Sequence, residues 1–304
     1  MTIRNALTVD VEDYFHVSAF AKNIHYHDWD NYPLRVENNT RRILDLFDAH
    51  EVKATFFVLG WVAERAPALV REIAHRGHEV ACHGFSHQLI YNQSPEVFRE
   101  ETLRSKYLLE DIIQTPVRGY RAASYSITNR SRWALDVLAE AGFDYDSSIF
   151  PVRHDRYGIA NAPVFPHRMQ TPNGQSLVEF PLSTATLLKY RLPVAGGGYF
   201  RLYPYAVTRA GLSQINRLQQ PFIFYLHPWE IDPAQPRVST NWASRFRHYN
   251  NLDKCENRLC RLLSDFEFAT TESVLQSLGL IDTASVNASS AQAHISRFPN
   301  AVHL

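Results

Sequence analysis

The sequence has no excess of either charge and contains little cysteine. Its 304 residues include 31 lysines and arginines and 31 aspartates and glutamates, so the formal net charge is zero. No basic run favours nucleic acid or anionic lipid as an obligatory partner. The three cysteines, Cys82, Cys255 and Cys260, form neither an even disulfide framework nor a paired zinc motif. This pattern suits a reducing compartment.

Long hydrophobic runs are also absent. No segment reaches the roughly 18 apolar residues of a membrane span, and the chain starts with a strand pattern in place of the basic and apolar regions of a secretory signal. We therefore expect no integral membrane segment and a cytoplasmic location, in solution or at the inner face of the membrane. A chain of this length can form one large α/β domain or a domain with an extension.

Apolar periodicity predicts strands that alternate with amphipathic helices. After a first strand that ends near residue 12, the predicted strands are 54–59, 79–82, 117–121 and 222–226, and the predicted helices are 35–50, 61–76, 96–113 and 130–141. This alternation predicts a parallel sheet covered by helices. Residues 282–304 show no periodicity and are predicted to be a disordered tail.

Two histidines four residues apart, His83 and His87, directly follow one predicted strand, and the first strand ends in Asp10, Glu12 and Asp13. Carboxylates held close together can all stay ionised when a cation lies beside them. Two imidazoles and one carboxylate would leave coordination positions open for water and substrate, so the pattern predicts a catalytic metal site. The alternative is that the histidines only pack and the acids form an ordinary turn.

The carboxylate ligand of this site has two candidates. Side chains alternate along a strand, which puts Glu12 on the same side as Asp10 and favours Glu12. A bulge at the end of the strand would favour Asp13 instead. Zinc is the usual metal for two histidines and a carboxylate, and cobalt, nickel or iron would also fit.

Two further polar residues, Arg121 and His227, also stand where predicted strands end. Parallel strands bring their carboxyl ends to one face, which is where parallel barrels place their active sites. We therefore expect Asp10, His83, Arg121 and His227 to gather there. Arg121 could otherwise pair with a surface carboxylate, and His227 could cap its strand and pack on Trp229.

Five ordered segments resemble the motifs of the polysaccharide deacetylases that share the NodB homology domain (carbohydrate esterase family 4). The segments are 8–12, 54–60, 77–87, 119–126 and 224–228. The resemblance implies a distorted parallel (β/α) barrel with a C-terminal α/β extension. The domain boundaries that we expect are 1–230 for the catalytic domain, 231–281 for an extension packed on the barrel, and 282–304 for the tail.

The same resemblance implies roles for the residues that match its motifs. Asp10 would be the general base, Arg121 would orient it, and His227 would be the general acid. A buried carboxylate such as Asp146 or Glu179 would keep His227 cationic. The remaining matched residues, Glu12 (or Asp13), His83 and His87, would bind the divalent metal, and a backbone N–H near Tyr125 would face the oxyanion.

A closer resemblance, to the subgroup associated with exopolysaccharide and exosortase loci, rests on segments 145–151, 196–201, 227–232 and 244–249. It implies an N-acetylated polysaccharide or its lipid-linked precursor as substrate. The expected substrate-binding residues are Tyr125, Asp146, Tyr199 and Trp229, for each of which core packing is the alternative. Segment 244–251 could contact an anionic sugar or pyrophosphate through Arg245, Arg247 and His248, or form only a solvated helix end.

The resemblance therefore predicts an enzyme that removes N-acetyl groups from an amino-sugar polymer with the help of a divalent metal. Two other functions compete with it. One is hydrolysis of a small amide on the same fold, as in allantoinase-like relatives, and the other is carbohydrate binding without catalysis. The oligomeric state is open.

Overall fold

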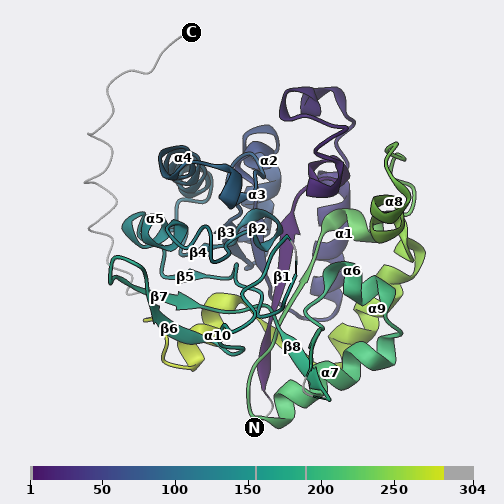
Figure 1. The fold of residues 1–304 in the computed structure, drawn as a ribbon. Helices are drawn as coiled ribbons and strands as arrows, with labels where there is room; N and C mark the ends of the chain where they lie inside the picture. Colours follow the sequence, from purple (N-terminus) through teal and green to yellow (C-terminus); the bar gives the residue numbers. More distant parts are fainter. Residues whose placement is uncertain (1–2, 155, 189, 284–304) are drawn as a thin grey trace.

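A nine-stranded sheet forms the centre of the computed structural model, which describes residues 3–154, 156–188 and 190–283 (Figure 1). Its strands are β1 (Arg4–Val11), β2 (Thr55–Val58), β3 (Glu79–Cys82), β4 (Gly119–Tyr120), β5 (Tyr145–Asp146), β6 (His167–Gln170), β7 (Ser176–Glu179), β10 (Ile223–Leu226) and β11 (Glu267–Ala269). They follow the order β10-β1-β2-β3-β4-β5-β7-β6, and β11 also pairs with β1. Among the described residues of this sheet, β6 and β7 are the one antiparallel pair. The predicted parallel α/β architecture is thus confirmed.

The central strands are apolar, which suits their burial under the covering helices. All residues of β2 and β10 are buried, and so is every residue of β1 after Arg4. Strands buried on both faces read as continuous hydrophobic runs rather than as alternating patterns. Figure 1 shows β1 in the middle of the molecule, between the helices labelled α4 and α5 on one side and those labelled α7 and α9 on the other.

The covering helices are amphipathic. They are α1 (Val36–Ala49), α2 (Gly60–Arg65), α3 (Pro67–His75), α4 (Pro95–Ile113), α5 (Ala134–Glu140), α6 (Gly197–Leu202), α7 (Tyr205–Arg217), α8 (Trp242–Tyr249), α9 (Leu252–Asp265) and α10 (Thr271–Ser277). In α1, for example, the buried residues Val36, Thr40, Ile43, Leu44 and Phe47 recur at helical spacing. None of the helices in the described residues is long and apolar enough to span a bilayer.

The prediction of one continuous helix over 61–76 is wrong. The structure has two helices there, α2 and α3, which are separated by Ala66. Ala66 has φ −130° and ψ 54°, outside the helical region, and Pro67 begins α3. A proline disfavours the helical conformation of the residue before it and lacks the N–H that a continuous helix needs, so the break follows from Pro67.

Segments 180–188 and 190–196 follow β7 in the chain. They include a separate antiparallel hairpin, β8 (Thr184–Leu187) with β9 (Tyr190–Pro193). The chain then runs beside β10, where the Tyr225 amide donates to the Ala195 carbonyl over 2.7 Å and Gly196 forms an isolated parallel bridge with Tyr225. This irregular segment completes the distorted barrel.

The C-terminal segment is joined to the barrel through the sheet. β11 pairs parallel with β1 over Arg4–Ala6, and α9 packs with Leu252, Leu259 and Leu262 buried. The predicted tail lies outside the described residues from 284 onward.

The close passage of residues 196–198 along β10 generates a stability prediction. Gly196 has φ +130°, and a Cβ there would lie 1.9 Å from the Tyr225 carbonyl oxygen. We expect Gly196→Ala to lower the free energy of unfolding by about 2–4 kcal/mol, because strain and a backbone clash add. Urea denaturation measures the change.

Gly198→Ala is the matched control. A Cβ at Gly198 would meet no atom within 4 Å, so we expect no loss of stability there. Equal effects of the two substitutions would show that the contact with β10 does not require glycine.

Candidate active site and metal centre

The carboxyl ends of four parallel strands bring the predicted polar residues together. Asp10 is near the end of β1, whereas His83, Arg121 and His227 directly follow β3, β4 and β10. In the sheet these strands stand in the order β10-β1-β2-β3-β4, so only β2 intervenes between them. Because parallel strands end at the same edge, residues more than 200 positions apart along the chain converge.

Glu12, His83 and His87 form a buried cluster whose potential ligand atoms all lie within 4.8 Å of one another. The Nδ1 atom of His83 lies 2.8 Å from the Arg121 carbonyl oxygen. A carbonyl can only accept, so Nδ1 carries the proton and Nε2 is free to bind a metal. Burial lowers the pKa of His83 to about 4, which keeps the imidazole neutral as a metal ligand requires.

The environment of the Glu12 carboxylate also suits a bound cation. Its Oε2 atom has no hydrogen-bond partner within the described residues, although the Nε2 atom of His87 is only 2.7 Å away. Burial would raise the pKa of Glu12, but the adjacent His87 holds it below its usual value. A buried, ionised carboxylate beside two imidazoles is the donor set of a divalent metal site.

Asp13, the alternative carboxylate, is directed elsewhere. It accepts hydrogen bonds from the backbone amides of Tyr14 at 2.9 Å, Arg35 at 2.6 Å and Val36 at 2.8 Å. Asp13 therefore caps the short helix that follows β1 and holds the start of α1. Glu12 is the carboxylate that faces the histidines, as strand alternation favoured.

Arg121 holds Asp10 through a fully buried guanidinium. One nitrogen donates to Asp10 Oδ1 over 2.6 Å and to the Thr8 hydroxyl over 2.7 Å, and the others donate to the carbonyl and hydroxyl of Ser147. The guanidinium carbon also lies 4.1 Å from the centre of the Phe57 ring. These four hydrogen bonds fix the guanidinium, which orients the Asp10 carboxylate by a charge-assisted hydrogen bond.

His227 is held by Glu230, a residue for which we expected no role. The Nδ1 atom of His227 lies 3.0 Å from Glu230 Oε2, and Arg201 donates to the other carboxylate oxygen over 2.6 Å. Burial alone would lower the pKa of His227, but the hydrogen bond and charge of Glu230 raise it to about 9. The free Nε2 atom faces Asp10 Oδ2 at 3.9 Å and Glu12 Oε1 at 3.5 Å.

The expected partners Asp146 and Glu179 are therefore corrected. Both carboxylates are fully buried and face each other, and Asp146 accepts from the Ser148 hydroxyl over 2.5 Å. Asp146 thus has no surface that could contact a substrate. The spacing of Glu230 three residues after His227 is the capping-box spacing at a helix start, and it could have indicated the true partner.

The other substrate-binding candidates lie in different places. Trp229 is buried, with its ring stacked between His227 and His248 at centroid distances of 5.0 and 4.2 Å, so it positions His227 rather than lining a groove. Tyr125 is nearly buried, and its amide donates to the Ala122 carbonyl over 3.1 Å, so that amide does not face an oxyanion.

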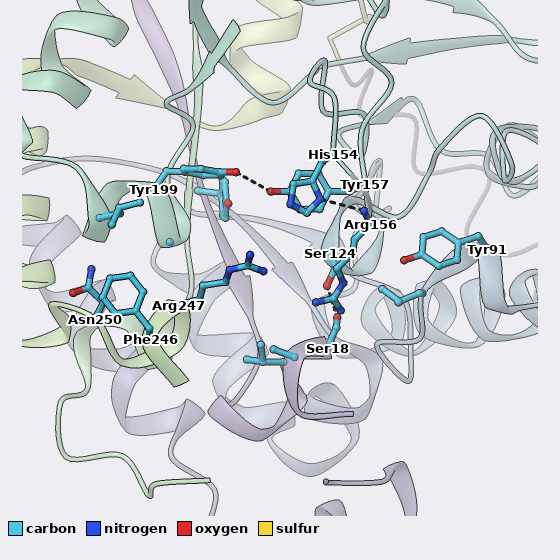
Figure 2. A pocket seen from close by; sticks show the side chains of 16 residues that line it. Ser18, Tyr91, Ser124, His154, Arg156, Tyr157, Tyr199, Phe246, Arg247 and Asn250 are labelled. Carbon is cyan, nitrogen blue, oxygen red and sulfur yellow. Dashed lines mark hydrogen bonds between the residues drawn. The ribbon is translucent and has the colours of Figure 1, made fainter. Parts of the chain in front are cut away.

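Tyr199 lines a cavity of about 450 Å³ beside this centre (Figure 2). Tyr225 forms part of the shared wall, because its ring also lies edge-on to the ring of His227 at 5.6 Å. Ser124, next to Tyr125, lines the cavity as well. The cavity therefore opens beside the proposed acid and base.

Fold and site together define a parallel α/β barrel with a His-His-carboxylate centre and a paired Asp and His at its carboxyl edge. Family models agree with this class. Residues 20–145 match the polysaccharide deacetylase model, and residues 147–276 match a domain of unknown function (DUF3473). Residues 20–145 are thus similar to polysaccharide deacetylases.

Individual relatives extend the comparison. A peptidoglycan-N-acetylglucosamine deacetylase of Bacillus cereus is 32% identical over 98 residues, which cover 32% of this chain and 36% of the relative. A chitooligosaccharide deacetylase of Bradyrhizobium sp. is 32% identical over 100 residues, which cover 33% and 43%. The matched region thus spans less than half the length of these curated relatives.

Solved structures show the same fold over most of the chain. A putative polysaccharide deacetylase from Mycobacterium smegmatis aligns with a TM-score of 0.60 at 23% identity, covering 91% of this chain and 90% of the other. The Puue allantoinase aligns with a TM-score of 0.56 at 14% identity, covering 93% and 92%. At these identities the comparisons establish the barrel-type fold alone.

Metal binding can be tested by substituting Glu12 and Asp13. We expect Glu12→Gln to weaken Zn²⁺ binding by more than roughly 100-fold, since the loss of an outer-sphere partner alone costs about 10–100-fold. Competition with a chelating dye measures the affinity of the metal-stripped chain. Asp13→Asn is the control, for which we expect unchanged Zn²⁺ affinity and lower stability, and the reverse pattern would assign the ligand to Asp13.

The buried carboxyl pair predicts a pH dependence of stability. Burial raises the pKa of Asp146 to about 6 and, with the charge of Asp146, raises the pKa of Glu179 well above its usual value. The folded chain therefore keeps a proton that the unfolded chain has released. The contribution of the pair is complete at low pH and is lost as the pH rises from about 4 past 6.

Glu179→Gln keeps a hydrogen-bond donor to Asp146 at every pH. Relative to the parent chain, we expect the variant to gain about 1–3 kcal/mol of stability between about pH 5 and pH 8. Urea denaturation across this range is the measurement. Glu140→Gln, at a surface glutamate paired with Arg99, controls for the loss of one acid, and parallel pH curves for all three chains would contradict the shared proton.

Proposed function

We propose that the chain is a divalent-metal-dependent hydrolase that removes N-acetyl groups from an amino-sugar polymer and releases acetate. One observation carries the proposal: Asp10 and His227 meet within 3.9 Å beside the Glu12, His83 and His87 cluster. The polysaccharide deacetylase match over residues 20–145 supports the same reaction.

The proposed metal is Zn²⁺, which Glu12, His83 and His87 would hold. When bound, such a cation supplies Lewis-acid chemistry, polarising a carbonyl oxygen and lowering the pKa of water. Burial of all three ligands limits the competition from bulk solvent.

The residues of the chain would then handle the protons. Asp10 would accept the proton of the attacking water through Oδ2, because Oδ1 is engaged by Arg121. His227 would donate a proton from Nε2 to the departing amine, while Glu230 holds Nδ1 and thereby the ring orientation. Acetate and a free amino sugar would be the products.

An extended substrate agrees with the cavity beside the acid and base. Its wall carries the aromatic rings of Tyr157, Tyr199 and Tyr225, and aromatic residues suit the binding of a sugar ring. The resemblance of segments 196–201 and 244–249 to the exopolysaccharide-associated subgroup supports an exopolysaccharide, or its lipid-linked precursor, as the natural polymer.

The decisive measurement is acetate release from N-acetylglucosamine oligomers by metal-stripped chain, with and without added Zn²⁺. We expect release that depends on the metal and falls by roughly 100-fold or more in Asp10→Asn and in His227→Ala, because general acid–base catalysis contributes about that much. Matched controls are Asp45→Asn and His75→Ala on exposed helix surfaces, which should retain activity.

Two results would count against the proposal. Acetate release that persists in Asp10→Asn would show that Asp10 is not the general base. Hydrolysis of allantoin without any release from oligomers would instead assign the site to small cyclic amides.

A further inference from the structure

The cavity beside the acid and base carries positive charge that the proposed deacetylation does not use. Arg156, in the loop after β5, and Arg247, near the end of α8, both line it. No lining residue that the structure describes is acidic. Figure 2 shows the two guanidinium groups directed toward the middle of the cavity from different walls.

Neither guanidinium has a carboxylate within ion-pair distance among the described residues, unlike the nearby Arg201, which pairs with Glu230. An unpaired guanidinium in a concave site with apolar walls favours an anion, because the low-dielectric surroundings strengthen the attraction. Two such groups with planar hydrogen-bonding forks suit a carboxylate or a phosphate.

We propose that this cavity is a subsite for an anionic group of the glycan, a carboxylate or a phosphate, next to the N-acetyl sugar at the catalytic centre. The inference rests on the proposed function and narrows its substrate class to acidic N-acetylated glycans.

The position of Arg247 is set by the same network that holds the acid. Arg201 donates to the Arg247 carbonyl over 3.1 Å and to the His248 carbonyl over 2.8 Å, while its Nε atom binds Glu230. The end of α8 is therefore anchored to the residue that orients His227. This connection gives the charged wall a defined place relative to the reacting atoms.

Another wall of the cavity is aromatic. The hydroxyls of Tyr157 and Tyr199 lie 3.1 Å apart, and the ring of His154 stacks on Tyr157 at 3.8 Å with an interplanar angle of 6°. Stacked rings of this kind offer a face for the C–H surface of a sugar. The cavity thus combines a surface for a pyranose ring with groups for its charge.

The aromatic surface continues outward along α8. Phe246 lines the cavity, and Trp242 stacks on it at 5.6 Å with an interplanar angle of 16°. Trp242 is 78% exposed, and Phe246 is 46% exposed. Large exposed rings beside a cavity are typical of a binding surface, and here they extend it to a further sugar of the same chain.

Binding to the metal-stripped full-length chain tests the subsite, because without the metal an anion cannot be retained by the cation and no turnover occurs. The probes are a hyaluronan hexasaccharide, in which glucuronate alternates with N-acetylglucosamine, and neutral N-acetylchitohexaose. Calorimetry should show that the acidic probe binds more tightly by roughly tenfold or more, and that added salt reduces this preference.

Replacing both arginines by glutamine should reduce the ratio of the two affinities by roughly tenfold, and replacing both by lysine should restore part of it. Arg217→Gln is the matched control. This exposed arginine lies beside residues 3 and 268, at the opposite end of β1, and its loss should not alter the ratio. Circular dichroism checks that each variant is folded.

A third probe, N-acetylchitobiose linked to a short isoprenyl pyrophosphate, separates the two sources of negative charge. Preference for the hexasaccharide assigns the subsite to a uronic acid, and preference for the pyrophosphate assigns it to a lipid linkage. Equal affinities for all probes, unchanged by the double glutamine variant, would overturn the subsite.

Acetate release from the same probes by the Zn²⁺-loaded chain distinguishes failure of the subsite from failure of the proposed function. Charge-dependent binding without release from any probe would retain the anionic subsite and reject the deacetylase. Release from the neutral oligomer with no preference for charge in either assay would retain the deacetylase and reject the subsite.

Discussion

Two buried arginines constrain how the whole active edge is built. Arg121 and Arg201 are among the largest fully buried side chains of the described residues, and a guanidinium stays charged at any physiological pH. Each must therefore be matched by a carboxylate and by enough acceptors to replace water. Arg121 pairs with Asp10, and Arg201 pairs with Glu230. The demand for neutralisation therefore orients Asp10 directly and His227 through Glu230.

The two ion pairs also connect elements that would otherwise be independent. Arg121 joins β1 to the segment after β5 through Ser147, and Arg201 joins α6 to the end of α8 and to the turn after β10. Between them lie the histidine and glutamate side chains of the candidate metal site. Breaking a buried pair leaves an uncompensated charge that costs about 3–5 kcal/mol, so the proposed catalysis and the stability of the fold depend on the same contacts.

Most of the fold and the main site residues could be predicted from local pattern. Continuous apolar runs indicated β2 and β10, and helical spacing indicated α1 and α4 to within a residue or two. The short strands β5, β6, β7 and β11 of the sheet were missed, because so few residues carry too little periodicity. The break at Pro67 was missed although its physical signal, a proline inside a helical pattern, was present.

The sequence by itself determined which chemical groups stand at strand ends, because period-two alternation and abrupt changes from apolar to polar residues are local properties of the chain. Only the tertiary structure decided which of them meet. It separated Glu12 from Asp13, replaced Asp146 by Glu230 as the partner of His227, and placed Arg156 and Arg247 in one cavity. The capping-box spacing of Glu230 after His227 was a local signal, but the convergence of Arg156 and Arg247 depends on how distant segments pack, which no spacing along the chain encodes.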